Sequence, residues 1–317
     1  MDDYNQLLVK IAYYYYRKGL TQGEIADKLL MSRQRVNRLL KKVWGEGIVS
    51  ITINGLSESY IELESQLEEI FKLKRAIVIP NPHIGEEDLM KDLSKAGANY
   101  LMSMIKDNLT IGIAWGRTLY NLGLSIPLTP PCKGISVIQL VGSLNLGEAP
   151  KQSDEITRIV AQKLSAQPYF IFAPTYMNNV DAKEIMMKEE SIKIIFDKMK
   201  TCDVILYSIG EIGTHNNSFK KIVMSQEDQD MIRQNAVGNL CMWYFDIDGK
   251  ILDIALHKRL MSIDTQTLKE VPDVVCIAGG VKKEKAIYAG LKGNMMNTLI
   301  TDQVTANSVL KMSKQTK

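Results

Sequence analysis

The sequence predicts an α/β protein in which a small helical unit, called the head here, precedes a larger body built on a parallel β-sheet. Its 317 residues correspond to two domains at the usual size of about 150 residues. Residues 1–54 carry nine Lys/Arg and five Asp/Glu, whereas the rest of the chain is nearly neutral. Beyond residue 76, short apolar runs alternate with helical stretches, which is typical of a parallel sheet covered by helices. We expect the head to cover residues 1–57 and the body residues 58–317.

The composition excludes several classes of protein. Hydrophobic residues make up 45% and charged residues 24% of the chain, as in ordinary globular proteins, so long disorder, collagen and a coiled coil are not expected. No apolar run is long enough for a transmembrane helix, and the acidic start lacks the features of a signal peptide. The four cysteines are far apart in apolar runs, which predicts buried free thiols and neither a disulfide nor a metal site. We therefore expect a cytoplasmic protein that contacts no membrane and needs no cofactor.

The head shows the pattern of three helices. Apolar residues at helical spacing predict a first helix over residues 7–15, and Gly19 ends it. Thr21 and Glu24 form a capping box that starts a second helix. Ser32 can cap a third helix over residues 33–43. Two short helices joined by a tight turn predict a helix-turn-helix.

The outer face of the third helix carries the side chains that DNA recognition requires. Between Arg17 and Lys42 there are eight basic and two acidic residues. Arg can bind guanine edges, Gln and Asn can bind adenine edges, and Lys can neutralise phosphates. The expected base-contacting residues are Arg33, Gln34, Arg35 and Asn37, and the expected backbone-contacting residues are Arg38, Lys41 and Lys42. A merely solvated helical face is the alternative that charge alone leaves open.

Two elements connect the head to the body. Residues 48–53 alternate in the manner of a β-strand and predict a wing beside the helices. Residues 58–72 have an apolar stripe at helical spacing that includes Leu67. This stripe has two possible partners, a neighbouring subunit or the body of the same chain.

The body alternates between predicted strands and predicted helices. Short apolar runs predict strands over residues 76–79, 110–114, 135–141, 169–172, 204–209, 274–277 and 298–300. Longer periodic stretches predict helices over residues 87–105, 155–166, 185–199, 227–235, 283–292 and 303–311. Residues 240–245 and 250–256, joined by residues 246–249, predict a hairpin inserted into this alternation.

Glycines follow four of the predicted strands, at the edge where ligands of such sheets bind. They are Gly116, Gly142, Gly210 and the pair Gly279-Gly280, and two of these positions open helices, whose free amides attract anions. A single glycine after a strand is usually only a turn. Four such strand ends, with Arg117, Thr118, Ser143 and Lys283 beside them, favour a small phosphorylated ligand. The spacing matches neither a dinucleotide-binding nor a nucleoside-triphosphatase motif.

The residues give little support for catalysis. His83, His215 and His257 are scattered without metal-ligand spacing. Asp246, Asp248 and Glu211 are possible acid–base groups, but residues 246–249 are typical of a hairpin turn. We expect no enzyme activity.

Several segments together resemble the SorC family of bacterial sugar-responsive transcription regulators. In the head these are Thr21-Gln22-Gly23-Glu24-Ile25-Ala26 and the stretch that continues to Gly47-Ile48-Val49. In the body the matching segments are Gly112-Ile113-Ala114-Trp115-Gly116-Arg117-Thr118-Leu119, Gln139-Leu140-Val141-Gly142-Ser143, Ala236-Val237-Gly238-Asn239 with Phe245-Asp246, Ala278-Gly279-Gly280 with Ala286-Ile287, and Leu299-Ile300-Thr301-Asp302. The resemblance extends over nearly the whole chain, and the Trp-Gly-Arg-Thr segment is its most specific part.

The resemblance implies a winged helix-turn-helix that binds operator DNA, and an effector domain with a fold like those of glucosamine-phosphate deaminase and ribose-phosphate isomerase. It also implies a homodimer or homotetramer controlled by a phosphorylated sugar. In the family, the loops that match Gly116, Arg117, Thr118, Gly280 and Lys283 help to hold the sugar phosphate, and an acidic residue that matches Asp246 binds sugar hydroxyls. The candidate ligand-binding residues are therefore Gly116, Arg117, Thr118, Leu119, Gly142, Ser143, Gly210, Asp246, Gly279, Gly280 and Lys283.

Two departures from the family pattern concern the ligand. Gly238-Asn239 replaces a Gly-Asp pair that many members have, which affects the sugar hydroxyl that is recognised, and Glu211 disfavours a phosphate on its side. The alternative reading is a sugar-phosphate isomerase or deaminase with a fused DNA-binding head. A regulator that also converts its ligand would need a general base, for which Asp246 is the candidate.

Overall fold

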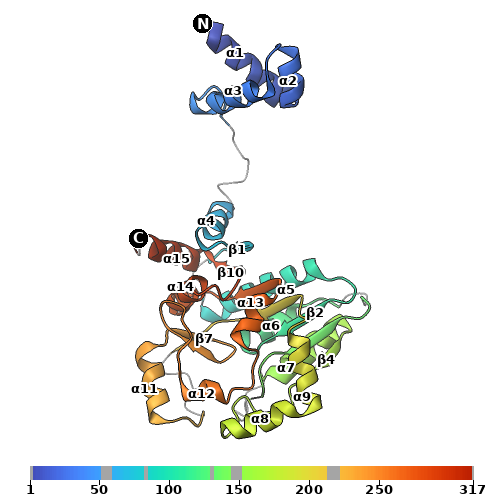
Figure 1. Ribbon diagram of the computed structural model, residues 1–317, viewed down its shortest axis with the longest axis vertical. Coiled ribbons are helices and arrows are strands. Elements are labelled where there is room, and N and C mark those ends of the chain that lie inside the picture. The colour runs from blue at the N-terminus through green and yellow to red at the C-terminus, as the bar shows by residue number, and fades with distance from the viewer. Residues whose placement is uncertain are drawn as a thin grey trace. The chain divides into compact units, whose positions relative to one another are not determined.

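The computed structural model describes residues 3–50, 59–81, 85–128, 132–143, 152–212 and 222–315. The chain divides into two compact units, Met1–Glu58 and Ser59–Lys317 (Figure 1). The predicted boundary between residues 57 and 58 lies outside the described residues. In the part of the chain that the structure describes, no helix has both the length and the apolar character that a membrane span needs.

The head consists of helices that surround a small apolar core. Helix α1 (Asp3–Ala12) runs into a π-helical turn η1 (Tyr13–Arg17), and helices α2 (Gln22–Lys28) and α3 (Arg33–Gly45) follow. The predicted caps are confirmed. Thr21 Oγ1 accepts from Glu24 N at 3.3 Å, Thr21 N donates to Glu24 Oε2 at 2.8 Å, and Ser32 Oγ accepts from Arg35 N at 3.2 Å. The core is made of Leu8, Ile11, Ala12, Ile25, Ala26, Val36, Leu39, Leu40 and Val43.

The predicted wing falls mostly outside the described residues. Residues 51–53 of that segment are among the residues 51–58 that the structure leaves undescribed. Ile48 and Val49 lie within the described part, where they have no strand conformation and pack against the head's core.

The body is built on a seven-stranded sheet with the order β1-β10-β9-β5-β2-β3-β4, in which every neighbouring pair is parallel. The strands are β1 (Arg75–Ile79), β2 (Thr110–Ile113), β3 (Ser136–Gln139), β4 (Gln167–Tyr169), β5 (Val204–Tyr207), β9 (Asp273–Ile277) and β10 (Thr298–Asp302). The adjacent strands β10, β9 and β5 are buried along their whole length, because helices cover both faces. The predicted strand over residues 169–172 is displaced, since Phe172 is 83% exposed and the edge strand starts at Gln167.

The helices of the body mostly follow the predicted ranges. They are α5 (Glu86–Met104), α6 (Arg117–Ser125), α7 (Ser153–Leu164), α8 (Val180–Lys188), α9 (Glu190–Met199), α11 (Gln226–Asn235), α12 (Ala255–Lys258), α13 (Thr265–Glu270), α14 (Glu284–Lys292) and α15 (Gln303–Gln315). The prediction of a single helix over residues 185–199 was wrong, because the extended backbone of Glu189 separates α8 from α9. The two short helices α12 and α13 were not predicted, since one or two turns give little periodicity.

A second, three-stranded sheet lies beside the ends of the main strands. It consists of β6 (Gly210–Glu211), β7 (Gly238–Leu240) and β8 (Trp243–Phe245), which pair in antiparallel fashion. The hairpin turns at Cys241 and Met242, whose φ angles are 46° and 70°. The prediction placed the turn at residues 246–249. These residues do form a tight turn, but it is followed only by a single bridge between Phe245 and Ile251.

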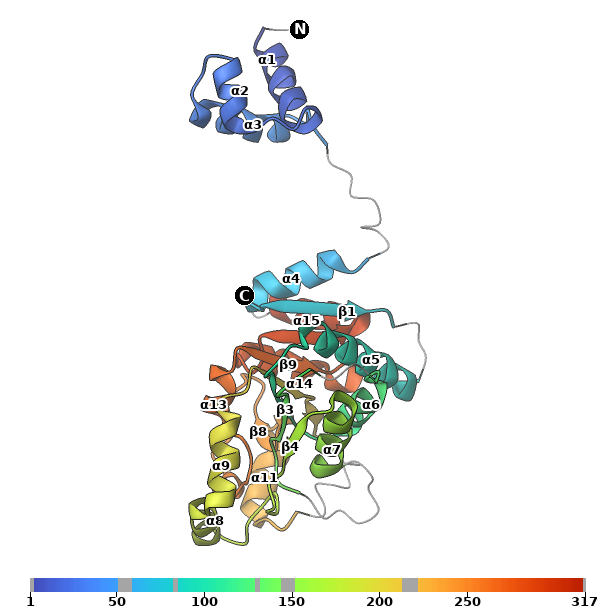
Figure 2. The ribbon, with the colours of Figure 1, turned by 90° about the vertical axis from the view of Figure 1, so that its right-hand side faces the viewer.

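Helix α4 (Ile61–Phe71) packs on the body of its own chain, one of the two partners proposed for its stripe. Leu67 is fully buried in the core of the body. Glu64 Oε1 accepts from Val78 N at 2.9 Å and Glu68 Oε1 accepts from Ala76 N at 2.8 Å, so α4 lies along strand β1 (Figure 2). Ile61 and Ile70 of α4 remain exposed.

Candidate functional site

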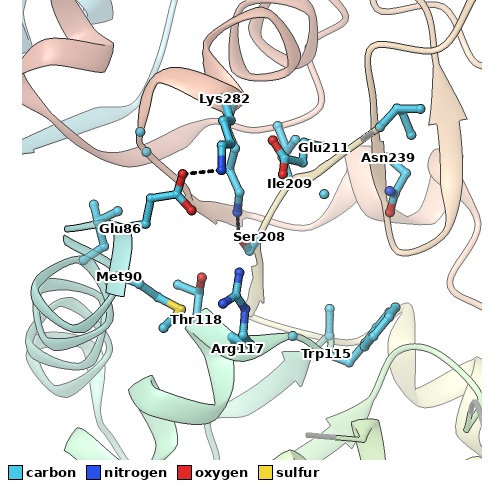
Figure 3. A pocket seen from close by; sticks show the side chains of 18 of the residues that line it. Glu86, Met90, Trp115, Arg117, Thr118, Ser208, Ile209, Glu211, Asn239 and Lys282 are labelled. Carbon is cyan, nitrogen blue, oxygen red and sulfur yellow. Dashed lines mark hydrogen bonds and ion pairs between the residues drawn. The ribbon is translucent and has the colours of Figure 1, made fainter. Parts of the chain in front are cut away.

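A cavity of about 550 Å³ opens where strands β2, β5 and β9 end. Helix α5, the β2–α6 and β9–η3 loops, and the three-stranded sheet supply its walls (Figure 3). Seven of the predicted ligand-binding residues line it, namely Gly116, Arg117, Thr118, Gly210, Gly279, Gly280 and Lys283. The parallel sheet brings these distant residues together, because all of its strands end on the same side.

The start of helix α6 forms one wall of the cavity. Gly116 precedes the helix with a φ of 125°, a conformation that side chains disfavour. Arg117 and Thr118 form the first turn, and no side chain caps it. The free amides of such a turn, together with the guanidinium of Arg117, favour an anion.

The opposite wall is the turn η3 (Val281–Lys283), which begins at the Gly279-Gly280 pair. Gly280 has a φ of 94°, and its carbonyl accepts from Lys283 N at 2.9 Å. Gly279 packs so closely on Asp302 that a Cβ atom there would collide with the carboxylate. The chain therefore turns sharply after β9 and brings Lys283 to the cavity.

Lys283 is the cation best suited to bind a ligand. Its Nζ lies 3.4 Å from Ser208 Oγ, and it forms no ion pair with a carboxylate among the described residues. Desolvation lowers the pKa of its ammonium group, and the nearby Arg117 acts in the same direction. Lys283 is half-buried, and a desolvated cation without a direct ion pair is costly, so an anionic ligand would relieve this cost.

Lys282 differs from its neighbour because it is already paired. Its Nζ lies 2.5 Å from Glu86 Oε1, and both side chains are mostly exposed (Figure 3). The bond with Lys282 lowers the pKa of Glu86 and raises the pKa of Lys282. Among the described residues, four cationic and two anionic side chains line the cavity, which gives them a positive balance: Arg117, Arg233, Lys282 and Lys283 against Glu86 and Glu211.

The remaining wall comes from the three-stranded sheet and mixes polar with apolar groups. Glu211 and Asn239 contribute polar side chains, and Met242 and Tyr244 contribute apolar surface, to which Trp115 adds from the β2–α6 loop. His257 supports this wall from behind, where its Nε2 accepts from Tyr244 N at 3.0 Å. Burial lowers the pKa of His257 to about 4, which keeps the ring neutral and able to accept that bond.

Four of the predicted ligand-binding residues do not line the cavity. Leu119 is fully buried in the core. Gly142 packs against the carbonyls of Ala173 and Pro174, and Ser143 Oγ lies 3.4 Å from Asp154 Oδ1.

Asp246 is the fourth of these residues, and it forms a turn instead. Its Oδ1 accepts from Asp248 N at 3.0 Å and from Lys250 N at 2.9 Å. It therefore stands neither where a sugar hydroxyl would bind in this cavity nor where a general base would act.

Some lining residues escaped prediction from the sequence. Ser208 directly follows strand β5, but the strand predicted over residues 204–209 included it, so it was not recognised. Asn239 was noted only as a departure from the family pattern. Glu86, Met90 and Arg233 reach the cavity from helices α5 and α11, and nothing in their local sequence marks them.

The head presents a second candidate surface. All seven predicted DNA-binding residues of α3 are exposed, and no acidic residue interrupts them between Arg33 and Gly45. Lys42 Nζ lies 5.4 Å from the ring centre of Tyr4. The helix thus offers a continuous positive face of the kind that binds nucleic acid.

The chain is similar to known regulators along most of its length. A family model described as "Putative sugar-binding domain" matches residues 57–311. The Deoxyribonucleoside regulator of Bacillus subtilis strain 168 is 29% identical over 305 residues, which cover 96% of this chain and 97% of that protein. Transcriptional regulator LsrR of Escherichia coli O157:H7 is 30% identical over 308 residues, which cover 96% and 94%. The crystal structure of the full-length Sorbitol Operon Regulator SorC from Klebsiella pneumoniae superposes with a TM-score of 0.73 at 28% identity and covers 98% of this chain and 99% of that one.

Proposed function

The chain belongs to the SorC family of sugar-binding transcriptional regulators, and from this premise we propose that a phosphorylated sugar bound in the cavity controls its affinity for operator DNA. The desolvated ammonium of Lys283, which forms no ion pair with a carboxylate of the described residues, is the observation that carries the phosphate part of this proposal. Arg117 and the free amides of α6 add further positive potential on the facing wall. A phosphate between these groups would neutralise the charge of Lys283 and accept hydrogen bonds from the free amides in the first turn of α6.

The rest of the cavity suits the sugar. Glu211 and Asn239 can bind hydroxyl groups, because a carboxylate accepts hydrogen bonds and an amide both donates and accepts them. The indole of Trp115 can pack against the apolar face of a sugar ring. Since Glu211 repels a phosphate, we place the phosphate at Arg117, Thr118 and Lys283 and the hydroxyl groups near Glu211.

A thermal-shift comparison of sugar phosphates with their unphosphorylated parents tests this assignment. A matching sugar phosphate at a hundredfold excess over its dissociation constant should stabilise the protein by about 2.7 kcal/mol through mass action. The parent sugar should stabilise it far less, because it cannot neutralise Lys283. Equal stabilisation by a parent sugar and its phosphate would contradict a phosphate site.

We further propose that α2 and α3 act as a DNA-binding helix-turn-helix, with α3 as the recognition helix. Its N-terminal residues Arg33, Gln34, Arg35 and Asn37 would contact base edges, and Arg38, Lys41 and Lys42 would contact phosphates. Operators for such heads have paired half-sites, so a homodimer or homotetramer is part of the proposal.

Alanine substitutions on α3 should separate these two roles. Arg35→Ala should lose about 1–3 kcal/mol of discrimination between operator and unrelated DNA, because it removes a base contact. Lys42→Ala should weaken both DNAs alike and reduce the salt dependence of binding by about one unit. Lys10→Ala, in the exposed part of α1, is the matched control and should change neither quantity. Binding measured at several salt concentrations decides this, and equal effects of Arg35→Ala and Lys10→Ala would refute the assignment.

The alternative of an isomerase or deaminase with a fused head finds no support among the relatives, which are transcriptional regulators and not enzymes. The position of Asp246 in a surface turn also removes the candidate base for a regulator that converts its ligand. The likeness to the folds of glucosamine-phosphate deaminase and ribose-phosphate isomerase stays a prediction.

A further inference from the structure

Two helices of the body begin with the same local arrangement, an aspartate followed three residues later by a threonine. At α13, Asp264 Oδ1 accepts from Gln266 N at 3.0 Å and from Thr267 N at 2.8 Å, and Oδ2 accepts from Thr267 Oγ1 at 2.6 Å. At α15, Asp302 Oδ1 accepts from Val304 N and Thr305 N at 3.1 Å each, and Oδ2 accepts from Thr305 Oγ1 at 2.5 Å. Both aspartates therefore cap a helix in the same way.

Asp302 binds two further groups that a helix cap does not require. Its Oδ2 also accepts from Gly280 N at 2.9 Å, and its Oδ1 accepts from Asn81 Nδ2 at 2.9 Å. Thr305 Oγ1 lies 2.8 Å from the same Gly280 N. Asp302 and Thr305 are both fully buried, whereas Asp264 is exposed. The carboxylate of Asp302 thus joins the end of β10 to the turn after β9.

The turn that Asp302 holds is the one that carries Lys283. Gly280 has a φ of 94°, and its carbonyl closes the η3 turn by accepting from Lys283 N. Gly279 leaves no space for a side chain beside the carboxylate. The amide of Gly280 is therefore fixed on one side by Asp302 and Thr305, and its carbonyl fixes the backbone of Lys283 on the other.

We propose that Asp302, together with Thr305, is a positioning residue of the ligand site, which holds the Gly279-Gly280 turn so that Lys283 reaches the cavity. This inference rests on the proposed function, because it assigns Asp302 a role at the proposed anion site. It goes beyond capping of α15, since a helix cap needs only the bonds that Asp264 also makes. Asp302 acts through the turn and does not itself line the cavity.

The comparison of Asp302→Asn with Asp264→Asn in the full-length protein tests the proposal. Each variant replaces one carboxylate oxygen of a helix-capping aspartate by an amide nitrogen. Only Asp302→Asn also changes the group that accepts from Gly280 N. In the protein without ligand, Asp302→Asn should speed hydrogen exchange across residues 280–283 by about tenfold, the effect expected for the loss of one hydrogen bond. Asp264→Asn should leave exchange at these residues unchanged.

Stabilisation by inorganic phosphate is the second readout. Asp302→Asn should weaken phosphate binding by about tenfold or more, because the turn no longer fixes Lys283. Phosphate that binds to the head affects both variants equally and cancels in the comparison. Thr305→Val removes one partner of Gly280 N while it keeps the carboxylate, and it should show a smaller effect in the same direction. It serves as the second variant if Asp302→Asn does not fold.

The outcomes separate the two proposals. If Asp302→Asn, or Thr305→Val in its place, behaves like Asp264→Asn in both exchange and phosphate binding, Asp302 only caps a helix and the inference is wrong. If phosphate does not stabilise even the unaltered protein, the proposed anion site fails, and the exchange comparison still decides whether Asp302 holds the turn.

Discussion

Lys283→Met is expected to abolish the stabilisation of the protein by a phosphorylated sugar. The substitution keeps an unbranched side chain that is one atom shorter and removes the ammonium group, so the anion loses a desolvated partner. Losing one member of such a pair costs about 2–5 kcal/mol of binding free energy, which corresponds to a loss of affinity of about 30-fold or more. Titration calorimetry or a thermal-shift series with the sugar phosphate measures this loss.

The stability of the ligand-free variant gives an independent check on this explanation. Desolvation of Lys283 lowers its pKa, which means that the folded protein disfavours its charge. Lys283→Met should therefore leave the ligand-free protein at least as stable as before. Lys282→Met is the matched control, because Lys282 is exposed and already paired with Glu86, and its effect on affinity should be much smaller. A larger loss of affinity in Lys282→Met than in Lys283→Met would assign the anion site to Lys282 instead.

Operator binding without ligand should survive in Lys283→Met, since the head is a separate compact unit.

Leu67→Asp is expected to destabilise the body by about 4 kcal/mol or more. The substitution removes a fully buried leucine and places a carboxylate in an apolar site, and each change alone costs several kcal/mol. Helix α4 would then separate from the core or unfold with it. Chemical denaturation of the variant, followed by the fluorescence of the tryptophans in the body, gives the change in the free energy of unfolding.

Ile61→Asp is the matched control, because it makes the same kind of change on the exposed side of the same helix. Ile61 is 55% exposed, so this variant should keep nearly the full stability. A loss of oligomer mass or of operator affinity in Ile61→Asp, without a loss of stability, would show that a neighbouring subunit covers this side of α4. A fully stable Leu67→Asp variant would contradict the packing of α4 described above.

The sequence was informative wherever a local pattern determines the structure. The capping box of Thr21 and Glu24 and the strand before Gly279 could be predicted because hydrogen bonding and burial over a few residues define them. Lys283 could be found because it closely follows a strand end, and parallel strands end on one side. The predicted hairpin was displaced because Cys241 and Met242, which make the turn, are not typical turn residues.

The parts of the site that escaped prediction depend on contacts between distant segments. Arg233 reaches the cavity from α11, which Asp228 holds against the body through bonds from Ala255 N and Leu256 N, and the sequence around it is that of an ordinary polar helix. Asp246 shows the reverse case, in which a local pattern suggested a site residue that does not line the cavity. An aspartate near a hairpin can bind a sugar hydroxyl or act as a general base, but it can also stabilise the turn itself. Its bonds to the backbone of Asp248 and Lys250 show that the turn uses its carboxylate.

Glu64 and Glu68 of α4 protect the edge of the main sheet against pairing with other protein molecules. Strand β1 stands at the border of the sheet, and its outward amides at Ala76 and Val78 would otherwise invite a strand of another molecule to pair with them. Glu64 and Glu68 occupy these donors with carboxylates, so an incoming strand would first have to displace two hydrogen bonds that involve a charged acceptor. Helix α4 thus protects the edge strand β1 from pairing with a strand of another molecule. A body from which α4 is removed would expose these two amides together with the apolar site that Leu67 fills, so it should be prone to aggregate.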